Sequence, residues 1–200
     1  MNKTFLTVFL LLTILTLASF IIIPIKPVNS TFSNSTSFSQ IPTISGPQSI
    51  IVILVKFKDL ENIKTRDEIK DLVFNQLNEY FKEVSYGNIS LTGDVTPVWY
   101  TLKSVKYYGS GKEKLESLIL DAVKAADKDV DFRNYQYIMV VHAGDDQDRS
   151  GNPDDITSFS SKGNKYPITT MEGRLSFGVI CVAELDPIGP YACLLYTSPS

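Results

Sequence analysis

Acidic side chains gather in one polar segment, AGDDQDRSGNPDD from Ala143 to Asp155, and offer oxygen ligands for a hard cation. From Asp146, the spacing D-x-D-x-S-G resembles the first half of a calcium-binding loop, where alternating oxygens converge and a glycine makes the turn. The twelfth position is Thr157, where such loops carry a bidentate glutamate. Calcium is one interpretation, and a solvated acidic turn is the other. The cluster consists of Asp145, Asp146, Asp148, Ser150, Gly151, Asp154 and Asp155.

The single histidine, His142, stands directly before this loop, at the end of an apolar run. A catalytic histidine needs a nucleophile or a carboxylate positioned with it, and the nearby sequence offers only loop serines and aspartates. Ser158, Ser160 and Ser161 lack the G-x-S-x-G turn of hydrolases, and Asp155 is not followed by a D-x-S-x-S metal-site spacing. We therefore expect a structural, hydrogen-bonded histidine.

Composition narrows the classes further. The chain has 200 residues, is 44% hydrophobic and 20% charged, and carries a net charge of −3, which is typical of one globular domain. An acidic chain has no charge-based reason to bind nucleic acid. The 2 cysteines, Cys181 and Cys193, exclude a disulfide-stapled miniprotein and a four-cysteine zinc site. The single histidine excludes a histidine-rich metal site. We expect Cys181 to be a small buried apolar residue.

The N-terminal segment is an export or anchoring sequence. A basic start at Lys3 precedes an almost unbroken apolar run from Phe5 to Ile25, and residues 1–28 are interpreted as a signal peptide or an N-terminal membrane anchor. The positive-inside rule places the following chain outside the cytoplasm, secreted or held at the cell surface. Residues 29–47 are rich in serine and threonine and form a predicted flexible stalk.

N-x-[ST] sequons occur at Asn29, Asn34 and Asn88. On an exported chain such sequons are candidate glycosylation sites.

Strands and helices alternate in the remaining chain. Ile50–Phe57 is β-branched, apolar and too short for a helix, so it is predicted to be a central strand covered on both faces. Thr65 and Glu68 form a capping box that opens an amphipathic helix, which Gly87 ends.

The later segments continue this pattern. Segments 88–95 and 98–102 suit a hairpin or a bent strand pair, since Gly93 and Pro97 interrupt them. Leu115 to Ala126 has the spacing of a second helix. Tyr135–His142 and Phe177–Ala183 are predicted buried strands. The fold class is therefore α/β, with a mixed, twisted sheet and two long helices.

With these elements in place, two stretches are the most specific: YFKEVSYG (Tyr80 to Gly87), which opens the longer stretch YFKEVSYGNISLTGDV that ends at Val95, and the VVHAG segment at His142. Through these stretches the chain resembles the immune inhibitor A-like M6 family of secreted zinc metallopeptidases, over about residues 48–192. The stretches VILVKFKD (Val52 to Asp59), AADKDVDFRNYQYIMVVHAGDDQ (Ala125 to Gln147), GNPDDITS (Gly151 to Ser158) and IGPYA (Ile188 to Ala192) follow the family's order.

The resemblance implies a zincin-like fold, of which residues 48–192 are the upper half. In the family, the H-E-x-x-H helix follows a segment like IGPYA: its histidines bind zinc, and its glutamate activates the metal-bound water. This chain instead reads CLLYTSPS from Cys193 to Ser200, and residues 193–200 are interpreted as a non-native tail fused to a truncated gene. No catalytic, cofactor-binding or metal-ligating residue carries over to the chain as written.

The expected function is therefore that of an N-terminal fragment of an exported zinc metalloendopeptidase, inactive by itself, whose full-length form binds zinc and cleaves peptide or protein substrates. By resemblance, the sheet edge that pairs with an extended substrate lies between Ile156 and Met171. The first alternative is a noncatalytic, stalked α/β binding module with calcium as its candidate ligand. The second is a complete surface protein that lost its active site and keeps a peptide-binding edge.

Overall fold

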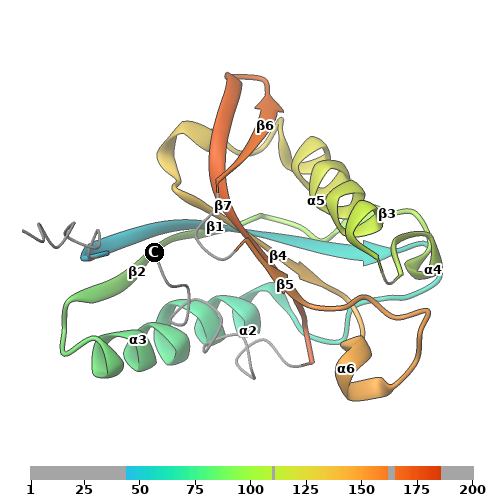
Figure 1. The fold of residues 1–200 in the computed structure, drawn as a ribbon, viewed down its shortest axis with the longest axis horizontal. Helices are drawn as coiled ribbons and strands as arrows, with labels where there is room; N and C mark the ends of the chain where they lie inside the picture. Colours follow the sequence, from blue (N-terminus) through green and yellow to red (C-terminus); the bar gives the residue numbers. More distant parts are fainter. Residues whose placement is uncertain (1–43, 110, 162–164, 186–200) are drawn as a thin grey trace, which may run out of the picture. The chain divides into compact units, whose positions relative to one another are not determined.

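A seven-stranded, mostly parallel sheet organises the residues that the computed structural model describes, which are 44–109, 111–161 and 165–185. Its strand order is β2-β1-β4-β7-β5, with β3 also paired to β1 and β6 to β7 (Figure 1). This confirms the predicted α/β class. The strands are β1 (Gly46–Phe57), β2 (Ile89–Val95), β3 (Tyr100–Leu102), β4 (Tyr137–His142), β5 (Phe159–Ser160), β6 (Tyr166–Thr170) and β7 (Gly173–Ala183).

Helices cover both faces of this sheet (Figure 1). A continuous helical run, made of α2 (Arg66–Asp71), a π-helical turn (Leu72–Leu77) and α3 (Asn78–Val84), connects β1 to β2 on one face. On the other face, α5 (Lys112–Ala126) connects β3 to β4. The shorter helices are α4 (Val105–Tyr108), a 3₁₀ turn (Phe132–Asn134) and α6 (Gln147–Ser150).

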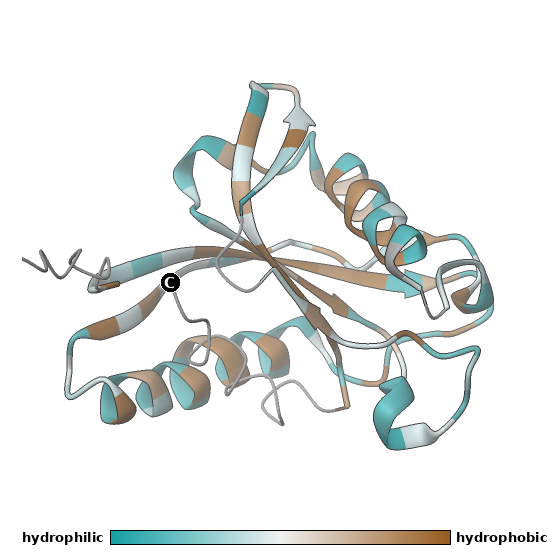
Figure 2. Ribbon diagram, in the orientation of Figure 1, coloured by the Kyte–Doolittle hydropathy of each residue, from teal (hydrophilic) through white to brown (hydrophobic). Residues whose placement is uncertain are grey.

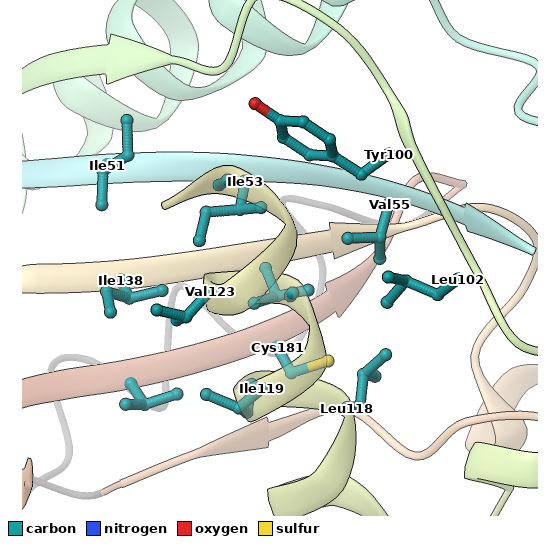
Figure 3. Packing of buried hydrophobic residues seen from close by; sticks show 14 of the residues in the cluster. Ile51, Ile53, Val55, Tyr100, Leu102, Leu118, Ile119, Val123, Ile138 and Cys181 are labelled. Atoms are coloured by element: carbon teal, nitrogen blue, oxygen red, sulfur yellow. The ribbon is translucent and has the colours of Figure 1, made fainter. Parts of the chain in front are cut away.

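Alternation along β1 divides the core into two layers, because successive side chains of a strand point to opposite faces. Ile51, Ile53 and Val55 pack in the cluster that contains α5 (Figure 3). Ile50, Val52 and Leu54 pack in the cluster that contains the first helical run. The central strands therefore carry hydrophobic residues almost continuously (Figure 2), and the predicted two-sided burial of β1 is confirmed.

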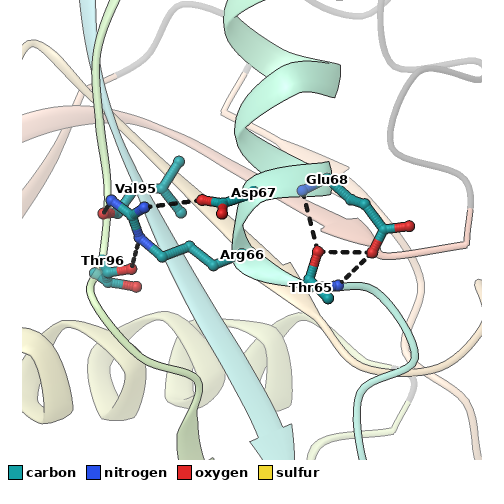
Figure 4. A network of polar contacts seen from close by, with 6 residues as sticks. All are labelled: Thr65, Arg66, Asp67, Glu68, Val95 and Thr96. Carbon is teal, nitrogen blue, oxygen red and sulfur yellow. Dashed lines mark hydrogen bonds and ion pairs between the residues drawn. The ribbon is translucent and has the colours of Figure 1, made fainter.

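The predicted capping box opens the first helical run (Figure 4). The Thr65 hydroxyl accepts a hydrogen bond from the Glu68 backbone N–H at 3.3 Å, and the Glu68 carboxylate accepts one from the Thr65 backbone N–H at 2.7 Å. The Arg66 guanidinium donates to the backbone oxygens of Val95 and Thr96, at 3.2 and 3.1 Å. The start of α2 is thus tied to the end of β2.

The first helical run ends at Val84, which is the last apolar position of the predicted helix before Gly87. Tyr86, not Gly87, is the first left-handed residue, with φ of 53°, and Gly87 follows with φ of 79°. The Tyr86 N–H bonds to the Glu83 oxygen at 3.1 Å, and the Gly87 N–H bonds to the Lys82 oxygen at 2.7 Å. These two bonds form a Schellman motif, in which a tyrosine occupies the position that glycine usually takes.

The prediction of a hairpin or bent strand pair for 88–102 is wrong. β2 and β3 do not pair with each other, and both lie parallel to β1, against Gly46–Val52 and Val55–Phe57 respectively. Between them, the Thr96 N–H bonds to the Val52 oxygen at 2.9 Å, and the Thr96 hydroxyl accepts from the Leu54 N–H at 3.1 Å. The chain therefore continues along the same edge of β1 rather than turning back.

β1 begins at Gly46, within the last residues of the segment 29–47 that is predicted as the stalk. The predicted leader and most of the stalk fall outside the described residues, as do IGPYA and the tail at 193–200. Within 44–109, 111–161 and 165–185, no helix is long and apolar enough to cross a membrane.

Candidate functional site

The carboxyl ends of three parallel strands, β1, β4 and β7, lie side by side at one end of the sheet. His142 at the end of β4 is in register with Val55 of β1 and with Ala183 of β7. The neighbours of β1 are β2 and β3 on one side and β4 on the other. Successive strands are therefore added first on one side of β1 and then on the other, which makes a topological switch point between β1 and β4. Ligands of open α/β sheets bind outside the carboxyl ends of strands at such switch points. The loops that follow β1 and β4, together with Glu184 directly after β7, therefore form the candidate site.

His142 lies fully buried at this carboxyl end of the strands. Its Nδ1 is 2.9 Å from the Ala143 carbonyl oxygen, so Nδ1 carries the proton and donates it. Burial lowers the pKa of His142, although the Ala143 carbonyl and the carboxylates of Asp146, Glu184 and Asp155 act in the opposite direction. Its Nε2 has no hydrogen-bond partner among the described residues. The imidazole is therefore neutral and, in this part of the chain, is not paired with a nucleophile as a catalytic base would be.

The lowered pKa of His142 predicts that the protein loses stability below neutral pH. In the unfolded chain the imidazole gains a proton as the pH falls through its ordinary pKa of 6.5. In the folded state the pKa is lower, so the imidazole stays neutral at that pH. The free energy of unfolding should then fall with pH below that value, by at most about 1.4 kcal/mol per pH unit. Urea unfolding at about pH 7.5 and about pH 5.5 measures this change, and His142→Gln should remove it. Equal or greater stability of the parent chain at the lower pH would contradict the assignment.

Glu184, the residue after β7, holds the loops after β1 and β4 together. Its side chain is fully buried, and its carboxylate accepts backbone N–H groups from both loops. Ile63 donates at 2.9 and 3.0 Å to the two carboxylate oxygens, Lys64 donates at 2.8 Å, and Gly144 donates at 3.0 Å. Carboxylates that accept several backbone N–H bonds make strong, charge-assisted contacts. Glu184 therefore fixes the loops after β1 and β4 against the end of β7.

The acidic loop folds as a set of capped turns. Asp146 is buried, and its carboxylate accepts the backbone N–H of Asp148 at 2.7 Å, which caps the start of α6. The same carboxylate accepts the backbone N–H of Ser158 at 2.7 Å, which holds the end of the loop against its start. The Ser150 hydroxyl donates to the Asp155 carboxylate at 2.6 Å, and Asp145 forms an ion pair with Arg149 at 3.5 Å.

The described residues do not bring the acidic side chains of this loop together around one point. Within them, no group of three or more histidine, cysteine, aspartate or glutamate side chains is arranged to hold a metal ion. The calcium interpretation has no geometric support there and stays a hypothesis. The same holds for zinc.

The serines near β5 do not form a nucleophile with His142. The Ser161 hydroxyl accepts the Val179 N–H at 3.0 Å and so holds the chain against β7. The hydroxyls of Ser158 and Ser160 have no hydrogen-bond partner among the described residues. Among the described residues, no hydrogen bond joins one of these serines to His142.

Cys181 lies fully buried near the carboxyl end of β7, and its burial is as the sequence predicts. Burial, with a smaller effect of the Asp146 carboxylate, raises the pKa of its thiol to about 12. Because only the thiolate is nucleophilic, Cys181 should not react with a disulfide reagent at about pH 8 until the protein unfolds. Timed labelling of a Cys193→Ser variant, with and without denaturant, measures this. Rapid labelling of the native protein would show that β7 is accessible.

A cavity of about 580 Å³ lies between α5 and the strands β5 and β6. Its volume is in the range of small-molecule sites. Its apolar lining residues are Leu115, Ile119, Leu120, Phe159, Tyr166, Pro167, Ile168 and Val179.

Comparison with known proteins assigns no function to these features. No protein-family model matches the sequence, and no curated protein matches it.

Proposed function

We propose that this chain carries the substrate-binding sheet of an exported zinc metalloendopeptidase, and that its zinc-binding helix belongs to native sequence beyond Ala192. The proposal combines the resemblance of residues 48–192 to M6 peptidases with one structural observation, which is the position of β5.

β5 supports the proposal because it ends the strand order and lies in the segment 156–171, where the resemblance places the substrate-binding edge. Phe159 and Ser160 pair antiparallel with Cys181 and Ile180 of β7, and the Ser161 N–H extends this pairing to the Val179 oxygen at 2.8 Å. No strand among the described residues covers the other edge of β5. An extended peptide can add to such an edge through backbone hydrogen bonds.

The residues of the described region would bind and orient a substrate, while the zinc ligands would come from the helix beyond Ala192. Among the described residues, no group of three or more histidine, cysteine, aspartate or glutamate side chains is arranged to hold a metal ion, and the Glu184 carboxylate is occupied by backbone N–H groups. Zinc, when bound by the full-length protein, would supply the activated water. The contribution of the described residues is the rigid wall behind the peptide, which Glu184 and Asp146 hold in place.

Casein hydrolysis tests this proposal with two proteins. The chain as printed should be inactive. The product of the complete native gene should cleave casein, should lose activity with a chelator, and should lose it again when the glutamate between the zinc-binding histidines is replaced by glutamine. A complete product that folds but does not cleave peptides would overturn the proposal.

The cavity beside α5 favours a second candidate, a noncatalytic binding module on a stalk. Leu115, Ile119 and Phe159 give it an apolar lining suited to a small ligand. A thermal-shift screen of small apolar compounds measures this candidate. Ligand binding by a complete gene product without peptidase activity would favour it over the peptidase.

A further inference from the structure

We propose that Asn88 is an N-glycosylation site and that the exposed ring of Tyr86 supports the first sugar. This inference rests on the export of the chain, which is part of the proposed function, but it needs neither zinc nor peptidase activity. The sequons at Asn29 and Asn34 lie outside the described residues, whereas Asn88 lies in the turn between α3 and β2.

Tyr86 combines two locally unfavourable features. It is the C′ residue of the Schellman motif, with φ of 53°, a conformation that glycine adopts without the steric cost of a Cβ atom. Its side chain is also 94% exposed, so packing does not repay that cost. A backbone outlier that packing does not explain is a starting point for a functional hypothesis. Because Tyr86 is two residues before Asn88, its function would be at that sequon.

The turn presents the Asn88 amide in a fixed position. The backbone N–H and the side-chain Nδ2 of Asn88 both donate to the Ser85 carbonyl oxygen, at 3.1 and 2.8 Å. The Ser85 hydroxyl accepts a hydrogen bond from the Ile89 N–H at 2.9 Å. The backbone carbonyl oxygen of Asn88 accepts one from the Gly46 N–H at 2.7 Å. The residue itself remains exposed. The amide nitrogen carries two hydrogens, so one can be replaced while the other keeps its bond to Ser85.

The modification is a group transfer with a defined donor. The Nδ2 atom of Asn88 attacks C1 of an oligosaccharide that is linked to a lipid pyrophosphate in the export compartment. The N–C1 bond forms, Nδ2 loses one proton to the surrounding water, and the C1–O bond breaks with its electron pair leaving on the lipid pyrophosphate. Ser90 supplies the hydroxyl that the N-x-[ST] acceptor pattern requires.

The ring of Tyr86 is suited to stabilise the attached sugar. An aromatic face carries partial negative charge, and the C–H groups on one face of a pyranose ring carry partial positive charge. A sugar over this ring would cover the exposed tyrosine and order the turn. The glycan should therefore raise the melting temperature of the chain when Tyr86 is present and not when alanine replaces it.

The experiment uses the full chain with Asn29→Gln and Asn34→Gln, produced in a glycosylating eukaryotic host behind the host's own secretion signal. We expect a mobility shift that peptide N-glycosidase removes, with conversion of Asn88 to aspartate in the peptide map. Ser90→Ala should abolish this shift. Enzymatic removal of the glycan should lower the melting temperature, and Tyr86→Ala should eliminate that decrease.

Two results would overturn the inference. Protein recovered from the lumen or the medium with Asn88 unmodified would exclude the site. An equal melting decrease in the parent and in Tyr86→Ala would exclude the tyrosine as the platform. Glycosylation at Asn88 in a protein without peptidase activity would leave this inference standing while the proposed function fails.

Discussion

Replacing Glu184 with alanine should lower the free energy of unfolding by about 3–6 kcal/mol, because three backbone N–H groups would lose a buried carboxylate. Those groups belong to Ile63, Lys64 and Gly144, in loops far from Glu184 in the sequence. The expected loss is a large part of the total stability of a typical domain, about 5–15 kcal/mol. Urea unfolding of the parent and variant chains at neutral pH measures the difference.

The matched control is Glu61→Ala, which removes a carboxylate of the same type from the surface. The Glu61 side chain is 75% exposed and forms one ion pair, with Lys56 at 2.7 Å. Exposed ion pairs contribute little, so this variant should unfold almost as the parent does. Glu184→Gln should fall between the two, because it keeps an acceptor oxygen but places an N–H donor against the backbone donors. Equal effects of the two alanine variants would contradict the role of Glu184 as the tie between the loops.

The second large effect is expected at Gly93 in β2. Its φ is +140°, and a Cβ atom there would lie 1.9 Å from the backbone oxygen of Ile50 in β1. Backbone atoms of the central strand cannot move away as the end of a side chain can. Gly93→Ala should therefore separate β2 from β1 and cost more than about 3 kcal/mol, combining strain with lost strand pairing. Chemical denaturation and amide hydrogen exchange of β2 report this loss.

Gly151→Ala is the control for the backbone conformation alone. Gly151 has φ of +69°, but a Cβ atom there would meet nothing within 4 Å. This variant should cost only about 1 kcal/mol, the usual penalty for alanine in a left-handed conformation. Similar losses for both alanine variants would show that the close approach of β2 to β1 is not important.

Local sequence patterns predicted the elements of the fold well but not all of their partners. The β-branched run at Ile50–Phe57 and the capping box at Thr65 depend on neighbouring residues, and both form as predicted. The pairing of β2 and of β3 with β1 depends instead on Thr96, which lies between them. Its hydrogen bonds to β1 join residues more than 40 positions apart in the sequence. Alternation indicates a strand but does not identify its partner.

The same limit applies to the candidate site. The sequence indicates His142 and the acidic loop as candidate functional residues, because histidine and clustered aspartates are residue types that commonly bind ligands or take part in catalysis. It did not indicate Glu184, which stands alone in the sequence and meets its partners at separations of 40, 120 and 121 residues. Its only signal was a charged residue directly after an apolar strand, and a buried role cannot be read from that pattern.

Sequencing of the native gene through and beyond the codon for Ala192 is the decisive test of the peptidase assignment. We predict that the reading frame continues there and soon encodes H-E-x-x-H in place of CLLYTSPS. A native gene that encodes CLLYTSPS and then stops, or that continues without such a motif, would contradict the assignment of this sheet to a zinc metallopeptidase.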